Sequence, residues 1–131
     1  MDLNRLFPLS FFLFLFLACL PVQAGTESIM DKANRLIEEK KYVEAVKTLE
    51  SPELIRNGEA QFILYVAYEY GKGVAVDKSQ SLHRLFISAY LGYPPAVEAM
   101  SIFADHGALD IQRNEAAKTF WEEEYYRLVD Q

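Results

Sequence analysis

The stretch AQFILYVAYEYGKGVAVDKSQSLHRLFISAYLGYPPA, residues 60–96, decides the fold of this 131-residue chain. The spacing of its apolar and glycine residues is repeated in the residues that follow it. A shift of 36 residues aligns four landmarks without a gap: Ala60 with Ala96, Leu64 with Met100, Gly71 with Gly107, and Leu85 with Trp121. An internal repeat of this length is typical of stacked helical hairpins.

Within this stretch, local signals predict two helices joined by a glycine-rich turn. Apolar residues recur at spacings of three and four over residues 59–70, which indicates an amphipathic helix. Gly71 ends this helix, because glycine tolerates the left-handed conformation that follows a helix. Asp77 stands three residues before Gln80, a capping-box arrangement that begins a second helix ending near Gly92.

The flanking residues predict two further hairpins. Downstream, Pro94 fits the first turn of a helix, and Asn114 is placed to cap the last one. Upstream, Pro52 interrupts the second helix of a more divergent hairpin and leaves a short extra turn. The predicted fold is therefore all-α, an α-solenoid with six main helices in about three antiparallel hairpins: a divergent hairpin at 27–56, a repeat at 58–93 and a degraded repeat at 94–129.

Residues 60–96 resemble the Sel-one-like repeats, which are relatives of the tetratricopeptide repeats. Residues 96–131 resemble a degraded second copy with Ala104 in place of a tyrosine, and residues 27–51 are more similar to a plain tetratricopeptide unit. The residue types that carry the resemblance stand at the following positions: Ala60, Leu64, Tyr68, Gly71, Gly73, Val74, Asp77, Ala89, Gly92 and Ala96.

This resemblance implies a right-handed superhelix whose members act as adaptors or scaffolds in protein complexes. Exported bacterial proteins of this kind serve in envelope assembly, in host interaction, and as immunity partners of secreted effectors. The family has no shared catalytic residues that could be transferred to this chain. The resemblance therefore implies a binding class without naming a partner.

The N-terminal residues are typical of a secretory signal. Residues 9–20 are apolar except for Ser10, and this run of about 12 residues is shorter than the roughly 20 that span a bilayer. A Val-Gln-Ala sequence ending at Ala24 supplies a small-residue cleavage pattern. We expect 1–24 to be a signal peptide and 25–131 a single periplasmic or secreted domain without a membrane span.

Two alternatives to a cleaved signal remain open. Cys19 follows Ala18 at the end of the apolar run, where acylation would make it the first residue of a lipoprotein, although Phe16 stands where such signals normally have leucine. An uncleaved anchor is disfavoured by its length. If cleavage follows Ala24, no cysteine remains, which removes disulfides, a thiol nucleophile and thiolate metal sites.

Charge and motif content argue against several function classes. The net charge of −6 and the absence of a Lys/Arg cluster disfavour nucleic acid and favour a basic partner. No nucleophile-elbow, phosphate-loop or dinucleotide motif is present. His83 and His106 lie on different repeats without a second ligand at metal spacing, and the carboxylates of 122–124 point in different directions around one helix. We expect no catalytic residue, metal or cofactor.

By analogy with tetratricopeptide helices, the first helix of each hairpin lines an inner face that binds a partner. The inferred face is acidic with aromatic and aliphatic anchors, which suits a basic amphipathic segment of another protein. An equally supported interpretation is that Phe62 and Tyr70 pack against neighbouring helices. The predicted partner-binding residues are Asn34, Glu38, Phe62, Val66, Glu69, Tyr70, Glu98, Ile102, Asp105 and His106.

Together these features predict an exported, non-enzymatic protein-interaction module. An adaptor and an immunity protein that binds a secreted effector are two concrete forms of it. The alternative is a membrane-attached structural component of an envelope complex. Trp121, Tyr125 and Tyr126 would either cap the end of the stack or form a dimer contact.

Overall fold

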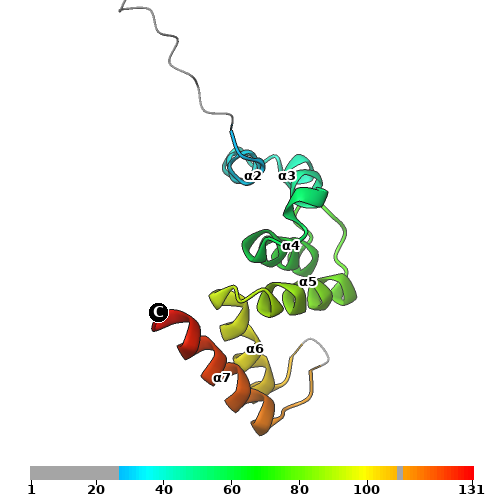
Figure 1. Ribbon diagram of the computed structural model, residues 1–131. Coiled ribbons are helices and arrows are strands. Elements are labelled where there is room, and N and C mark those ends of the chain that lie inside the picture. Colours follow the sequence, from blue (N-terminus) through cyan, green and yellow to red (C-terminus); the bar gives the residue numbers. More distant parts are fainter. Residues whose placement is uncertain (1–26, 109–110) are drawn as a thin grey trace, which may run out of the picture.

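The computed structural model describes residues 27–108 and 111–131, so the predicted signal peptide lies outside the described residues. Neighbouring helices pack as consecutive pairs, α2 with α3, α4 with α5 and α6 with α7, and the pairs stack in chain order (Figure 1). The predicted all-helical hairpin fold is confirmed. Its elements within the described residues are six α-helices and one 3-10 turn: α2 (Ile29–Glu38), α3 (Tyr42–Leu49), η2 (Pro52–Leu54), α4 (Gly58–Tyr70), α5 (Lys78–Tyr90), α6 (Pro94–His106) and α7 (Glu115–Val129).

Side-chain caps begin four of these helices. The hydroxyl of Ser28, the carboxamides of Asn57 and Asn114 and the carboxylate of Asp77 each accept a hydrogen bond of 2.9 to 3.0 Å from the backbone N–H three residues further on. Such caps satisfy donors that the first turn of a helix leaves unpaired. The helix α4 begins at Gly58, one residue before the predicted start, and α6 spans the same 13 positions shifted by 36 residues.

Two apolar clusters form the core, and α4 contributes to both. The first cluster joins α2, α3, η2 and α4, and the second joins α4, α5 and α6. Trp121 and Tyr125 of α7 pack against the second cluster. The buried members are Ala33, Val46, Leu49, Leu54, Ala60, Leu64 and Ala67 in the first cluster and Tyr65, Leu85, Ala89, Ala96, Val97 and Met100 in the second.

Some apolar positions that share the predicted helical spacing do not enter the core. Phe86 is 43% exposed and Tyr90 is 88% exposed, whereas Leu85 and Ala89 of the same helix are buried. The helix α5 packs against α4 and α6, so its opposite face remains in solvent. Helical periodicity identifies the apolar positions but does not decide how wide the packed face is.

A polar network ties the first hairpin to the second. The Tyr68 hydroxyl donates a 2.7 Å hydrogen bond to the Glu50 carboxylate, and this bond raises the pKa of Tyr68. Arg84 donates a 3.1 Å bond to Gln61 and lies 3.6 Å from Glu50. The amide of Gln61, only 1% exposed, donates in turn to the backbone carbonyl of Leu54 at 3.3 Å. The network links η2, α4 and α5 across the boundary between hairpins.

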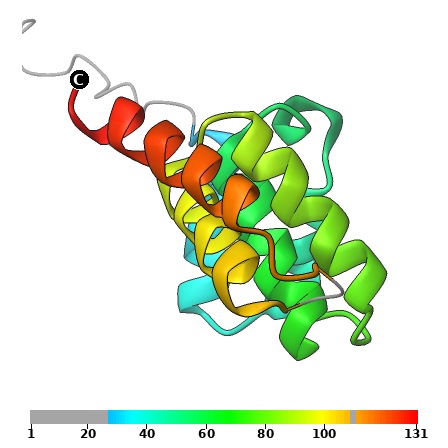
Figure 2. The same cartoon turned by 90° about the horizontal axis from the view of Figure 1, so that it is seen from below.

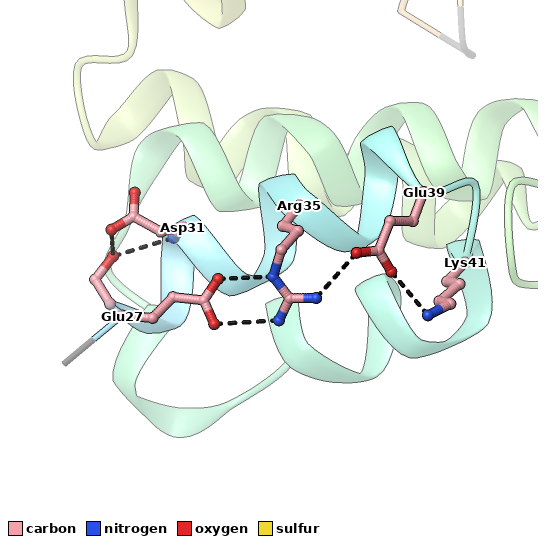
Figure 3. Close-up of polar contacts among 6 residues, drawn as sticks. Glu27, Asp31, Arg35, Glu39 and Lys41 are labelled. Atoms are coloured by element: carbon pink, nitrogen blue, oxygen red, sulfur yellow. Dashed lines mark hydrogen bonds and ion pairs between the residues drawn. The ribbon is translucent and has the colours of Figure 1, made fainter. Parts of the chain in front are cut away.

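A chain of exposed ion pairs runs along α2 (Figure 3). Arg35 donates to both carboxylate oxygens of Glu27, at 2.8 and 3.1 Å, and to Glu39 at 3.2 Å; Glu39 also pairs with Lys41 at 2.8 Å. The hydrogen bond from Arg35 lowers the pKa of Glu27. Exposed pairs of this kind add little stability, and these engage two of the acidic side chains of the first hairpin, Glu27 and Glu39.

Candidate partner-binding site

A groove of about 190 Å³ lies between α6 and α7. These two helices form the end of the stack, which is seen from below in Figure 2. Both helices present residues at the spacing i, i+3 and i+4, which places each set on one helical face. Ile102 is 49% exposed and Tyr126 is 61% exposed. We call this hollow the end groove; its lining residues are Glu98, Ser101 and Ile102 of α6 and Glu122, Tyr125 and Tyr126 of α7.

The charges around the end groove are unevenly compensated. Lys118 of α7 lies 3.5 Å from Asp105, 3.8 Å from Glu115 and 4.0 Å from Glu122, and these carboxylates, Asp105 foremost, raise its pKa. Within the described ranges, by contrast, Glu98 makes no ion pair. Its exposed carboxylate is therefore the negative charge of the end groove that lacks a basic neighbour.

The four predicted residues on α6 lie in different surroundings. Glu98 and Ile102 line the end groove, and Asp105 pairs with Lys118 beyond it. His106 is exposed at the last position of α6, and its Nδ1 lies 3.2 Å from the Ile102 carbonyl oxygen. Only Glu98 and Ile102 of the ten predicted residues therefore line this groove.

The four predicted residues on α4 divide between packing, pairing and exposure. Phe62 packs its ring against Tyr93, with centroids 5.5 Å apart, and Val66 packs on the second core cluster. Glu69 is held by Lys78 and Ser81 of α5, as described below. Tyr70 is 66% exposed, so packing accounts for Phe62 and not for Tyr70.

The two predicted residues on α2 are distant in sequence from the end groove and do not line it. Asn34 is half-buried and Glu38 is exposed. Partner binding by either residue stays a prediction. The predicted partner-binding residues did not include those that α7 supplies, Glu122, Tyr125 and Tyr126, although Tyr125 and Tyr126 were expected to cap the stack or form a dimer contact. The signal that identifies them is that their spacing matches that of Glu98, Ser101 and Ile102.

Two other hollows are less suited to a basic segment. One of about 140 Å³ between the first hairpin and α4 has an almost wholly apolar lining, and its one charged residue is Lys72, whose ammonium lies 5.6 Å from the centre of the Tyr42 ring. A wider one of about 520 Å³ on the first hairpin mixes Lys32 and Lys47 with Glu44 and Glu53. Neither presents uncompensated negative charge beside exposed aromatic rings.

Glu69 holds the two helices of the middle hairpin together. Its side chain is 13% exposed and accepts a 2.7 Å hydrogen bond from the Ser81 hydroxyl as well as one from the Lys78 ammonium. Burial alone would raise the pKa of Glu69, but the hydrogen bonds from Lys78 and Ser81 outweigh it and leave the pKa lowered. The carboxylate therefore acts as a structural acceptor between α4 and α5.

Because the pKa of Glu69 is lower in the folded state, its stabilising effect is complete above the ordinary glutamate pKa of about 4.3 and is lost as the pH falls through the folded-state value. We expect Glu69→Gln to cost about 1 kcal/mol at pH 7 and progressively less below pH ~4. Urea unfolding of both proteins from pH 7 to pH 3 measures this, with Glu123→Gln as an exposed control. Parallel stability curves for wild type and Glu69→Gln would contradict it.

The fold defines the class of this chain, a stack of helical hairpins with a groove between the last two helices. In the part of the chain that the structure describes, no group of side chains is arranged to hold a metal ion. No described helix is long and apolar enough to cross a membrane.

A comparison with solved structures supports this class. The chain is similar to a Sel1 repeat protein from Oxalobacter formigenes, with a TM-score of 0.66 and 20% sequence identity over 79% of this chain and 40% of that protein. The chain thus spans less than half of that protein's length. No protein-family model and no curated protein matches the sequence. The likeness shows an all-helical fold of stacked hairpins like that of the Sel1 repeat structure.

Proposed function

We propose that this protein is a non-enzymatic interaction module that binds another protein through the end groove. The observation that carries the proposal is the combination of the uncompensated Glu98 carboxylate with the exposed side chains of Ile102 and Tyr126 in one hollow. Aromatic and aliphatic side chains supply contact area that a partner can desolvate. The carboxylate selects a basic group and speeds its approach. The partner is therefore a protein with a basic, partly apolar segment.

Charge reversal at Glu98 tests this proposal. A partner captured by the tagged wild-type protein is expected to be recovered at least about fivefold less by Glu98→Lys, because an attractive contact worth about 1 kcal/mol is lost and a repulsive one replaces it. Glu123→Lys makes the same charge change at an exposed position of α7 outside the end groove and should retain the partner. Equal recovery by all three proteins would exclude the end groove as the binding surface.

The compartment in which binding takes place is a second part of the proposal. We place the protein in the periplasm or outside the cell, on the strength of the apolar segment at 9–20 and the cleavage pattern ending at Ala24. In that compartment it serves as an adaptor or as an immunity protein against a secreted effector. The intact mass of the protein from its native host is expected to begin at Gly25; a lipid-modified Cys19 or a retained N-terminus would favour the membrane-attached alternative instead.

A further inference from the structure

We infer that the segment of the partner that fills the end groove is an α-helix, docked as α6 docks on α4 and α5, with a basic residue facing Glu98. This inference rests on the proposed function and names the chemistry of its partner. It follows from comparing the end groove with the equivalent surface of the preceding hairpin.

The repeat spacing supplies that equivalent surface. When the lining residues of the end groove are shifted back by 36 positions, Glu98, Ser101 and Ile102 fall on Phe62, Tyr65 and Val66 of α4. Glu122, Tyr125 and Tyr126 fall on Phe86, Ala89 and Tyr90 of α5. Since α4 and α6 span the same 13 positions of their repeats, the correspondence holds for the structure as well as for the sequence.

In the middle hairpin a helix packs on four of these six positions, whereas Phe86 and Tyr90 remain 43% and 88% exposed. Tyr65 and Ala89 are buried in one cluster with residues of α6, and Phe62 and Val66 pack on the same cluster. The face that α6 turns toward them consists of Ala96, Val97 and Met100. The end groove is therefore built on the pattern of a surface that receives a helix, and within the described residues it holds none.

The differences between the two surfaces indicate what the incoming helix must carry. Tyr93, the residue that caps α6, packs its ring 5.5 Å from that of Phe62. The equivalent of Phe62 in the end groove is Glu98, so a helix docked in the same way places its capping residue against a carboxylate. Lysine or arginine at that position would supply the ion pair that Glu98 lacks.

The remaining positions keep an apolar character suited to a helix. Ile102 stands for Val66, which packs on the second core cluster, whereas Tyr126 repeats Tyr90, which stays exposed even where α6 is docked. A wholly polar surface would be expected if this end of the stack only protected the core from solvent, yet both side chains stay about half exposed or more. The partner helix should therefore place small or aliphatic residues three, four and seven positions after the basic one, as Ala96, Val97 and Met100 follow Tyr93.

A charge-swap experiment with peptides from this chain tests the inference. The probes are two fluorescently labelled peptides of residues 91–106, one with Tyr93→Lys and one with Tyr93→Glu, titrated with the intact wild-type protein and with its Glu98→Lys variant. The lysine peptide should bind the wild type about fivefold more tightly than the glutamate peptide, and the preference should reverse with Glu98→Lys. A third peptide that adds Met100→Pro to Tyr93→Lys should lose binding at least tenfold, because proline breaks the helix.

Any of three results would overturn the inference: a charge preference that does not reverse with Glu98→Lys, binding that tolerates Met100→Pro, or absence of binding by the lysine peptide at millimolar concentration. Circular dichroism of both proteins confirms that the variant is folded. If Glu98→Lys still reduces capture of the cellular partner, the proposed function stands and only the helical occupant is wrong. If capture is also unaffected, both fail.

Discussion

Replacing Leu85 by alanine should destabilise the protein by about 3 kcal/mol, within the range for large-to-small substitutions in well-packed cores. Leu85 is 0% exposed and lies in the second core cluster among side chains of α4 and α6. These neighbours belong to two other helices, so they cannot all close on the cavity without shifting the stack. The free energy of unfolding in urea measures the loss.

The next residue along the chain provides a matched control. Phe86 is 43% exposed and lies outside both core clusters. We expect Phe86→Ala to cost less than about 1 kcal/mol, although it removes a larger side chain than Leu85→Ala does. If the two variants lost equal stability, the assignment of the inner face of α5 would be wrong.

Gly73→Ala should destabilise the protein by roughly 3 kcal/mol. Gly73 has a φ of 80°, in the left-handed region, and a Cβ atom there would lie 2.3 Å from the carbonyl oxygen of Tyr42. The oxygen belongs to the backbone and the Cβ atom is bonded directly to it, so the clash can be relieved only by moving the first hairpin away from the loop after α4. Thermal or urea unfolding measures the effect.

Gly71→Ala separates the two contributions. Gly71 also has a left-handed φ of 70°, but its added Cβ would come no closer than 3.1 Å to a neighbour, the Val76 side chain. Only the conformational cost of about 1 kcal/mol is expected there. A Gly73→Ala variant no less stable than Gly71→Ala would show that the close approach to Tyr42 does not constrain the first hairpin.

The sequence predicts the helices well because their signals are local. Asn57, Asp77 and Asn114 act within three residues of their own positions, and the 36-residue repeat requires no knowledge of three-dimensional packing. The way a helix face meets its neighbours is not local. Phe62 is equally suited to an inner surface and to the ring of Tyr93, which lies 31 residues away, and only the placement of α6 decides between them.

Long-range polar contacts cannot be predicted from the sequence either, because they also depend on how the helices pack. Arg84 follows His83 on a helix and has the pattern of a solvated charge, yet it reaches Gln61 and Glu50 in other elements. The end groove contains both residues that the sequence predicts and residues that it does not. Glu98 and Ile102 were predicted from the first helix of the repeat, whereas Tyr126 depends on how the second helix lies against the first.

The contribution of α4 to both core clusters also explains where the repeat pattern is easiest to recognise. Of the described helices, α4 places buried side chains in both core clusters, with Leu64 in one and Tyr65 in the other. A substitution in α4 must fit two sets of packing neighbours at once, whereas α2 and α7, at the ends of the stack, each pack against only one cluster. Substitutions are therefore tolerated more readily toward the ends of the stack. The repeat pattern is accordingly clearest at 58–93, between the divergent hairpin at 27–56 and the degraded repeat at 94–129.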